Sequence, residues 1–534
     1  MVPLFTPTQV RAMDQRAFGR GVASAALMER ASGHLARAVL RLGGRGYGLR
    51  VGILAGKGNN GGDGIAAGRR LLDAGAAPLV HLVEGERALG EDGVRELCAY
   101  AGAGGRLANT VEAALDWADV AVDCLLGTGA RGEPRSPYRE AIMVLRAREG
   151  LPVVACDIPS GVDADTGGVA SVAVRADLTV CLGAHKRGLW LSPARSFCGR
   201  LVLGELGIVD ADDQPEAHVL EAADVAALVP PAPPEGEKRT QGVVVVLAGS
   251  PGMAGAAVLA ARGALAAGAG LVTVATADPD LVTVAVPEAL TARLDLADPG
   301  ASFEALAGRL EDADALAVGP GLGHDERTCR LVRRIVREVE VPIVLDADGI
   351  NVFRHDGDAL ADHAAPLFVL TPHGREFARL LGSGAEDVWE QRVALVPEKA
   401  RAWGAVLVVK GPGTLIGAPD GRVWVNPTGS AALATGGTGD VLTGMAATLV
   451  AQRPEPQSVV AAVWLHGAAG QAAEGRLTAR PVTPLDVAAA LPDVLHRLGE
   501  AGRASARRGA GVGLGEAGRA SARRGAGILE DRVR

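Results

Sequence analysis

Residues 435–440 form a glycine-rich run, TGGTGD, that ends in Asp440. The apolar pattern that follows predicts a helix from Asp440 to about Gln452. Glycine N–H groups at a helix start can bind phosphoryl oxygens, and an aspartate there can take a proton from a substrate hydroxyl during phosphate transfer. An ordinary helix cap would explain Asp440 but not three glycines beside it. The run therefore predicts a phosphoryl-transfer site with Asp440 as the base.

A second glycine-rich run, GKGNNGGDG at residues 56–64, follows the apolar segment 50–55. Its N–H groups could bind an anion, and the side-chain carbonyls of Asn59 and Asn60 could bind a monovalent cation or a ribose. A tight turn alone would explain two or three glycines. The chain has only five lysines and five asparagines, and this run contains Lys57 and two of the asparagines. The composition favours a binding loop over a plain turn.

Aspartates follow two further apolar segments in the first half of the chain. Asp123 precedes the glycine-containing residues 127–133, and Asp157 begins the sequence DIPSGVD. In an open α/β sheet the carboxyl ends of parallel strands lie at one edge, so these residues should meet the Asn60 loop. We interpret Asp123 as a carboxylate beside a bound cation and Asp163 as structural. For Asp157, a helix cap remains the alternative.

The second half repeats the pattern of glycines after apolar segments. Glycine-rich loops follow residues 243–247 and 315–318, and the sequence KGPGT begins at Lys410. His373 follows another apolar segment and precedes Glu376. Lone histidines are usually satisfied core or surface groups, and we interpret His34, His218, His324 and His466 in this way. For His373 the structural and the functional interpretation remain equally open.

Short apolar segments alternate with helical patterns along the whole chain, which predicts an α/β protein with parallel sheets. An opening helix is expected over residues 8–45, and the proline-rich residues 229–234 indicate a linker. A sixteen-residue repeat near the C-terminus is rich in Gly, Ala and Arg, which favours a disordered tail over a nucleic-acid-binding or partner-binding arm. The predicted domains are residues 1–222, a linker at 223–238, residues 239–497 and the tail 498–534.

The composition excludes several classes of protein. A chain of 534 residues and 54.2 kDa is too long for one ordinary core. The net charge of −8 and an aromatic share of 3% disfavour a nucleic-acid partner. The six cysteines form no CxxC pair and are expected to be mostly buried free thiols, and we expect neither a signal peptide nor a membrane span. We expect a cytoplasmic enzyme that acts on small molecules and forms a homo-oligomer. We expect no nucleic-acid partner and no membrane partner.

These motifs resemble a known pair of domains. NNGGD at residues 59–63 together with DIPSG at 157–161 resembles the NAD(P)H-hydrate epimerase domain, of Rossmann-like doubly wound fold. In the second half, GPGLG at 319–323, LDAD at 345–348, KG at 410–411 and GTGD at 437–440 resemble the ADP-dependent NAD(P)H-hydrate dehydratase domain, of ribokinase-like α/β fold. The resemblance covers about residues 8–495, in the order of the bifunctional bacterial nicotinamide nucleotide repair enzymes.

The resemblance implies a repair reaction on nicotinamide rings that have taken up water at carbon 6. The first domain would interconvert the R and S hydrates of NADH and NADPH, and the second would dehydrate the S form at the expense of ADP with Mg²⁺. Asn60, Asp123 and Ser160 match potassium ligands. The positions that match hydrate contacts in the first domain are Asn59, Asn60, Gly61, Gly62, Asp63, Gly127, Thr128, Gly129, Ala130, Arg131, Gly132, Glu133 and Asp157.

In the second domain, Ala256, Gly321, His373 and Asp440 match hydrate contacts. The positions that match the nucleotide site are Lys410, Gly411, Pro412, Gly413, Thr414 and Gly439. We expect Asp157 to be the acid/base of epimerisation and Asp440 the base of phosphoryl transfer. The resemblance is incomplete where a His-Pro-Gly-Glu motif is His373-Gly374-Arg375-Glu376, which bears on the loop around the hydrate.

Other functions remain to be weighed against this one. The main alternative is a ribokinase-like small-molecule kinase with a non-catalytic first domain, because residues 437–440 fit any donor site of that kind. A binding scaffold is disfavoured because the Asn60, Asp123 and Asp157 positions are intact. A dinucleotide oxidoreductase is weaker still, since no acid follows the first glycine-rich loop at the expected distance.

Overall fold

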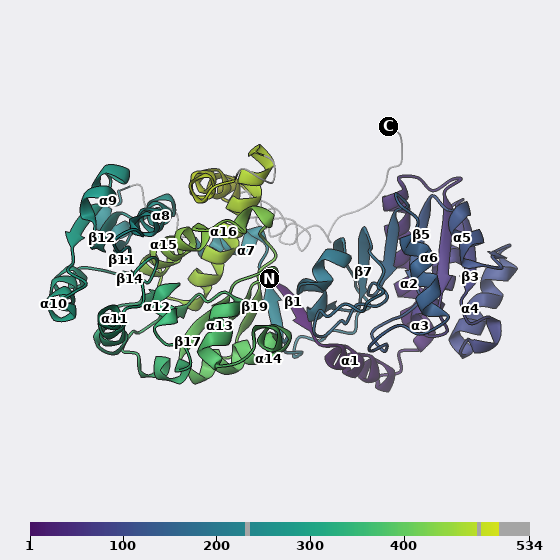
Figure 1. Ribbon diagram of the computed structural model, residues 1–534. Coiled ribbons are helices and arrows are strands. Elements are labelled where there is room, and N and C mark those ends of the chain that lie inside the picture. Colours follow the sequence, from purple (N-terminus) through teal and green to yellow (C-terminus); the bar gives the residue numbers. More distant parts are fainter. Residues whose placement is uncertain (230–234, 478–481, 501–534) are drawn as a thin grey trace, which may run out of the picture. The chain divides into compact units, whose positions relative to one another are not determined.

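The computed structural model describes residues 1–229, 235–477 and 482–500, which form two compact units (Figure 1). Unit 1 consists of residues 1–219, 354–361 and 372–427, and unit 2 of residues 220–353, 362–371 and 428 onward. Residues 230–234 of the expected linker and 501–534 of the expected tail lie outside the described residues. The domain boundaries expected from the sequence stay a prediction.

Unit 1 contains a parallel seven-stranded sheet in the order β4-β3-β2-β5-β6-β7-β9. Its strands are β2 (Arg50–Ala55), β3 (Ala77–Leu82), β4 (Arg106–Leu107), β5 (Val120–Cys124), β6 (Val153–Cys156), β7 (Leu178–Leu182) and β9 (Arg200–Gly204). From β2 the chain proceeds outward through β3 and β4 and then returns to the other side of β2 at β5. The carboxyl ends of β2 and β5 therefore mark the topological switch point of the sheet, where ligands bind in such folds.

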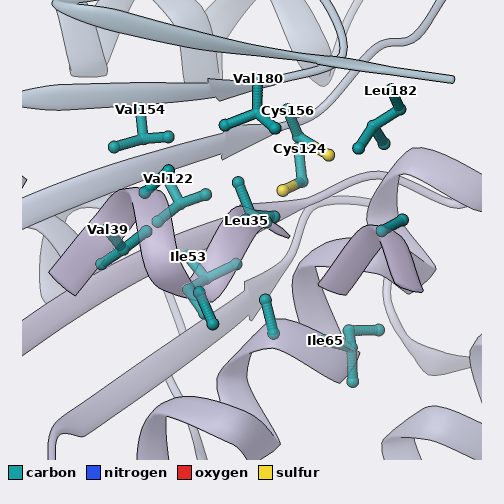
Figure 2. Close-up of a cluster of buried hydrophobic side chains, with 14 of the residues drawn as sticks. Leu35, Val39, Ile53, Ile65, Val122, Cys124, Val154, Cys156, Val180 and Leu182 are labelled. Carbon is teal, nitrogen blue, oxygen red and sulfur yellow. The ribbon is translucent and has the colours of Figure 1, made fainter. Parts of the chain in front are cut away.

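Helices cover both faces of this sheet (Figure 1). On one face lie α2 (Ser24–Gly43) and α3 (Asn59–Asp73), with α4 (Glu91–Gly102) packed on α3. On the other face lie α5 (Val111–Trp117) and α6 (Tyr138–Arg146). Figure 2 shows the core of the first face, where Ile53, Val122 and Val180 of the sheet lie with Leu35 of α2 and Ile65 of α3. The predicted doubly wound parallel sheet is confirmed.

The N-terminus differs from the single opening helix expected over residues 8–45. It forms β1 (Val2–Phe5), then α1 (Pro7–Gly19), and then α2. Thr6 and Gln9 form a capping box that starts α1, and the break before α2 includes Gly21 at φ +84°, a conformation that glycine adopts without strain. Most of the range is helical as predicted, but the break divides it into α1 and α2, and both helices line one cavity.

Unit 1 also contains a run of strands in the order β17-β18-β19-β10-β1-β8. Their bounds are β17 (Ala405–Val409), β18 (Leu415–Gly417), β19 (Val423–Val425), β10 (Ala217–Val219) and β8 (His185–Lys186). The helices α13 (Gly374–Leu381) and α14 (Ala385–Ala402) pack against one another. Antiparallel pairs occur here between β17 and β18 and between β18 and β19.

Unit 2 contains six parallel strands in the order β13-β12-β11-β14-β15-β16. Their bounds are β11 (Val243–Leu247), β12 (Leu271–Thr276), β13 (Leu290–Arg293), β14 (Ala315–Val318), β15 (Ile343–Leu345) and β16 (Phe368–Leu370). The order again reverses next to the first strand, between β11 and β14. The helices α8 (Ala254–Ala266) and α15 (Thr438–Gln452) pack on this sheet and on each other.

The expected α/β class is confirmed in both units. No helix in the described part of the chain has the length and apolar character needed to span a membrane. The six cysteines are present as thiols, and four of them are buried, as predicted.

Candidate active sites

A cavity of about 550 Å³ opens at the switch point of the seven-stranded sheet in unit 1. Helices α1 and α2 line part of it, together with the loops that follow β2 and β5. Seven of the predicted hydrate-binding residues line the cavity with Asp157, namely Asn59, Asn60, Asp63, Gly127, Thr128, Gly129 and Ala130. The structure thus brings together loops that are far apart in the sequence, as the order of the strands requires.

The three predicted potassium ligands belong to one buried network. Asp123 is fully buried, and its carboxylate accepts hydrogen bonds from Ser160 Oγ at 2.6 Å, Ser160 N at 2.8 Å and Leu125 N at 3.1 Å. Asn60 Nδ2 donates to Leu126 O at 3.2 Å, and Leu126 N donates to Ser160 Oγ at 2.9 Å. Burial raises the pKa of Asp123 to about 6, although the bonds from Ser160 oppose the shift.

Asn60 Oδ1 is buried and has no hydrogen-bond partner among the described residues. An unpaired buried carbonyl oxygen is costly, and a hard cation is one group that would satisfy it. Its neighbours in the network also offer oxygen atoms, from Asp123, Ser160 and Leu126. The donor set present fits an alkali cation.

Asp157 forms an ion pair with Lys186, a side chain that is 1% exposed. Asp157 Oδ1 accepts from Lys186 Nζ and from Leu182 N at 3.0 Å, and Lys186 Nζ also donates to Leu182 O at 2.6 Å. Asp157 is not a helix cap, because it follows β6 with φ +66°, an uncommon conformation for a residue other than glycine. A strained backbone and a buried cation therefore hold this carboxylate against the cavity.

Two further carboxyls line the same cavity. Asp63 lies in the first turns of α3 and is 8% exposed, and burial raises its pKa well above the usual range. Asp14 comes from α1, and burial raises its pKa as well, with Lys186 opposing and Asp157 adding to the shift. Lys186 is thus one buried cation whose charge acts on three carboxyls of the cavity, Asp157, Asp63 and Asp14.

Some predicted hydrate contacts lie outside the cavity lining. Gly61 and Gly62 are buried, and a Cβ on Gly61 would lie 1.8 Å from Gly56 O, so this glycine is needed for the close approach of the backbone. Arg131, Gly132 and Glu133 are exposed residues of the loop after β5. The Glu133 carboxylate accepts from Ser171 N and Oγ, which holds this loop to residue 171.

Sequence reasoning did not place Lys186, Asp14 or Tyr138 in a site, and all three line the cavity. The rarity of lysine was a usable signal for Lys186. Asp14 carries no such signal, because it is one of several polar residues on a helix. Tyr138 OH donates to Glu84 at 2.7 Å and accepts from Lys57 N at 3.3 Å, and burial raises its pKa to about 12.

In unit 2 the loops after β11 and β14 are in direct contact. Gly321 has φ +62°, and a Cβ there would lie 2.8 Å from Met253 O and 2.9 Å from the Ala256 side chain. A Cβ on Gly319 would lie 1.8 Å from Asp346 O, at the end of β15. The predicted hydrate contacts Ala256 and Gly321 are therefore neighbours at the switch point of this sheet.

The run that ends in Asp440 forms the start of α15, as predicted. Gly437 is the N-cap with φ +93°, and the helix begins at Thr438, two residues before the expected start. Asp440 is half-buried in the first turn. Thr438 Oγ1 donates to Leu433 O at 2.8 Å, and His466 Nε2 lies 2.9 Å from Thr438 O. These bonds fix the loop, and His466 has the satisfied buried role expected of it.

The end of β15 is tied to the same helix. Thr443 Oγ1 donates to the buried Asp346 at 2.6 Å and to Gly439 O at 3.0 Å. Asp348 Oδ2 accepts from Gly323 N at 2.9 Å. Of the two LDAD carboxylates, Asp346 thus accepts from helix α15 and Asp348 from the glycine-rich loop after β14.

In unit 1, His373 lines a second cavity of about 630 Å³ together with Lys410, Gly411 and Pro412. His373 is the N-cap of α13, where its Nδ1 accepts from Arg375 N and Glu376 N, while Glu376 Oε2 accepts from His373 N at 2.8 Å. The capping box shows that the change from His-Pro-Gly-Glu leaves a defined helix start. Thr414 Oγ1 closes the 410–414 loop by donating to Gly411 O and accepting from Gly411 N.

Comparison with known proteins agrees with the order of the two sites. The family described as YjeF-related protein N-terminus matches residues 24–188, and the family described as NAD(P)H-hydrate dehydratase matches residues 244–493. A bifunctional NAD(P)H-hydrate repair enzyme of Moorella thermoacetica is 39% identical over 84% of this chain and 88% of its own length. The enzyme of that description from Salinibacter ruber is 36% identical over 84% of this chain and 88% of its own length.

The chain belongs to the family of bifunctional NAD(P)H-hydrate repair enzymes. The function expected from the sequence, NAD(P)H-hydrate repair by an epimerase and a dehydratase, is confirmed over the kinase alternative. Among solved structures, an ADP/ATP-dependent NAD(P)H-hydrate dehydratase from Bacillus subtilis, crystallised with ATP and Mg²⁺, is 32% identical with a TM-score of 0.45. That likeness covers 52% of this chain and 97% of the solved one.

Proposed function

We propose that the cavity around Asp157 epimerises the R and S hydrates of NADH and NADPH, with Asp157 as the acid/base at carbon 6. The observation that carries this role is the buried ion pair of Asp157 and Lys186 at the switch point of the sheet. A proton donated to the 6-hydroxyl lets it leave as water, while the ring-nitrogen lone pair forms the N1=C6 bond. Water then adds at carbon 6 and returns its proton to the site.

We propose that Asn60, Asp123 and Ser160 hold a potassium ion. The unpaired Asn60 Oδ1 and the buried Asp123 support this assignment, because both are oxygen donors whose burial is costly without a cation. A bound potassium ion would supply fixed positive charge at the switch point. Through Ser160 and Leu126, the same network also fixes the loop that carries Gly127 to Ala130.

For the second site we propose dehydration of the S hydrate at the expense of ADP bound with Mg²⁺. Asp440 takes the proton of the 6-hydroxyl while the oxygen of that hydroxyl attacks the terminal phosphorus of ADP, and AMP leaves. The ring-nitrogen lone pair then expels inorganic phosphate from carbon 6, and loss of a proton from carbon 5 gives the dihydropyridine. The N–H groups of residues 437–439, fixed by Thr438 and His466, would stabilise the transferred charge.

Residues 410–414 and Gly439 remain the proposed nucleotide contacts, with Lys410 as the cationic partner of a phosphate. The cavity that Lys410 shares with Gly411 and Pro412 supports the assignment of residues 410–414 as nucleotide contacts. His373 lines the same cavity with its side chain half-exposed, so a contact to substrate is compatible with its capping role. A homo-oligomer stays a prediction.

The experiment supplies the purified protein with S-NADH hydrate, ADP, magnesium and potassium and follows both dihydropyridine absorbance and phosphate. We expect one NADH, one AMP and one phosphate for each S hydrate consumed. Asp440→Asn should abolish this turnover, whereas Asp325→Asn, which keeps a capping side chain at the start of another helix in unit 2, should leave it intact. A stable phosphate ester in place of NADH would contradict the dehydratase and favour a kinase.

A further inference from the structure

Asp14 is unusual among the polar residues of α1. Gln9 belongs to the capping box, and Arg16 forms an ion pair with Asp213 at 2.6 Å. Asp14 is half-buried and lines the cavity, yet within the described ranges its carboxylate has no hydrogen bond and no ion pair. An unpartnered carboxylate on the inner face of a packed helix lowers stability. Its presence at the cavity points to a ligand or a reacting group.

The charges around Asp14 belong to the epimerase site. Burial favours the protonated form of Asp14, Lys186 stabilises its ionised form, and Asp157 again favours the protonated form. Both carboxyls therefore interact with the same buried ammonium group. They come from different elements, however, because Asp14 projects from α1 and Asp157 follows the end of β6. A ligand in this cavity would be bounded by carboxyls from two separate parts of the fold.

Epimerisation makes a demand that one acid/base meets poorly. The 6-hydroxyl of the R hydrate and that of the S hydrate lie on opposite faces of the ring. The conversion of R to S is the reverse of the conversion of S to R. A group that protonates the departing hydroxyl on one face must therefore also take the proton from the water that adds on that face. Two isomers therefore call for a proton donor and acceptor on each face.

Resting on the proposed epimerase function, we propose that Asp14 is the second acid/base of this site and acts on the ring face opposite to Asp157. The protonated Asp14 gives its proton to the 6-hydroxyl on its own face. The C6–O bond breaks, water leaves, and the N1 lone pair forms the N1=C6 bond. Water then attacks carbon 6 from the other face, and its proton passes to the Asp157 carboxylate. The enzyme is left ready for the reverse reaction.

Oxygen exchange tests this assignment directly. Pure R or pure S NADH hydrate is incubated with enzyme and potassium in oxygen-18 water without ADP, so that no dehydration takes place, and the enzyme-free rate is subtracted. The wild type should invert and exchange both isomers. Asp14→Asn should slow inversion at least ~100-fold while one isomer still exchanges its hydroxyl. Asp157→Asn should show the complementary pattern, with exchange of the other isomer.

Three controls separate a catalytic role of Asp14 from an effect on folding. Gln15→Ala, an exposed change on the same helix, should leave exchange and inversion intact. Asp14→Glu should retain inversion in part, and melting temperatures show whether Asp14→Asn is folded. The proposal is wrong if Asp14→Asn inverts at the wild-type rate, or if it is folded and loses or retains exchange of both isomers alike. Wild-type protein that exchanges and inverts neither isomer would instead contradict the epimerase function itself.

Discussion

The cavity around Asp157 and the loops around Asp440 position their reactive groups by different means. The first depends on buried charge, with Asp123 and the Asp157–Lys186 pair enclosed at the end of a sheet. The second depends on close backbone approach, at Gly321 in the loop after β14 and at Gly444 within α15. The contrast follows the chemistry, because proton transfer at carbon 6 needs groups with adjusted pKa values, whereas phosphate transfer needs rigidly placed N–H groups.

The largest effect should come from the backbone contact that supports α15. A Cβ on Gly444 would lie 1.9 Å from Ala260 O of α8, so Gly444→Ala must separate two packed helices. We expect a loss of about 3–5 kcal/mol of unfolding free energy in unit 2 and loss of dehydration. Gly308→Ala, a helical glycine with open space around it, should change stability by less than about 1 kcal/mol. Denaturant unfolding measures both.

The charge-based site should fail when its buried cation is removed. Lys186→Met leaves Asp157 without its partner, so we expect a loss of about 3 kcal/mol and of measurable epimerisation, while S hydrate is still dehydrated. Lys399→Met removes an ion pair with the exposed Glu398 and should change stability by less than about 1 kcal/mol. Dehydration lost together with epimerisation in a folded Lys186→Met protein would contradict the separation of the two sites.

Cation binding should depend on pH through Asp123. The pKa of Asp123, about 6, lies above the ordinary value, because the folded protein favours the protonated carboxyl. In the absence of a cation, the contribution of Asp123 to the free energy of unfolding is therefore lost as the pH rises from about 4 through 6. Potassium binds the ionised form and should therefore raise the melting temperature more at pH 8 than at pH 5. Asp123→Asn should remove this difference. Asp119→Asn is the control, because Arg50 holds the pKa of Asp119 at about 2.

The smallest effect concerns His373, where capping and substrate contact can be separated. His373→Asn keeps a capping side chain, whereas His373→Ala should cost about 1 kcal/mol. If the histidine also contacts substrate, the two variants should raise the KM for S hydrate or ADP equally despite their different stabilities. A KM that changes only in the alanine variant would leave His373 with a structural role.

Much of the fold follows from local sequence patterns. The buried parallel strands are largely apolar segments, so β2, β5, β11 and β14 were recognisable, and their order along the chain placed the glycine-rich loops at the switch points. The short strands β1, β10, β18 and β19 were not expected, because three or four residues carry no clear alternation. The break after Gly19 was missed for a similar reason, since a single Gly21 interrupts a continuous helical pattern.

The site residues show the same dependence on local sequence patterns. Motif residues such as Asn60, Asp157 and Asp440 were recognised because glycines or neighbouring polar residues mark them. Lys186 and Asp14 were missed because their roles depend on tertiary contacts that bring β8 and α1 to one cavity. Gly61 shows a demand that the motif did not reveal, because the close approach of its backbone to Gly56 requires a glycine, and its contact with substrate stays a prediction.

The most direct test of two separable sites mixes two variants. Asp157→Asn and Asp440→Asn proteins are each given mixed R and S NADH hydrate with ADP, magnesium and potassium, and dihydropyridine absorbance is followed. We predict that Asp157→Asn alone recovers only the S fraction, that Asp440→Asn alone recovers none, and that the mixture recovers both fractions. Recovery of both fractions by Asp157→Asn alone, or no recovery of the R fraction by the mixture, would contradict the account.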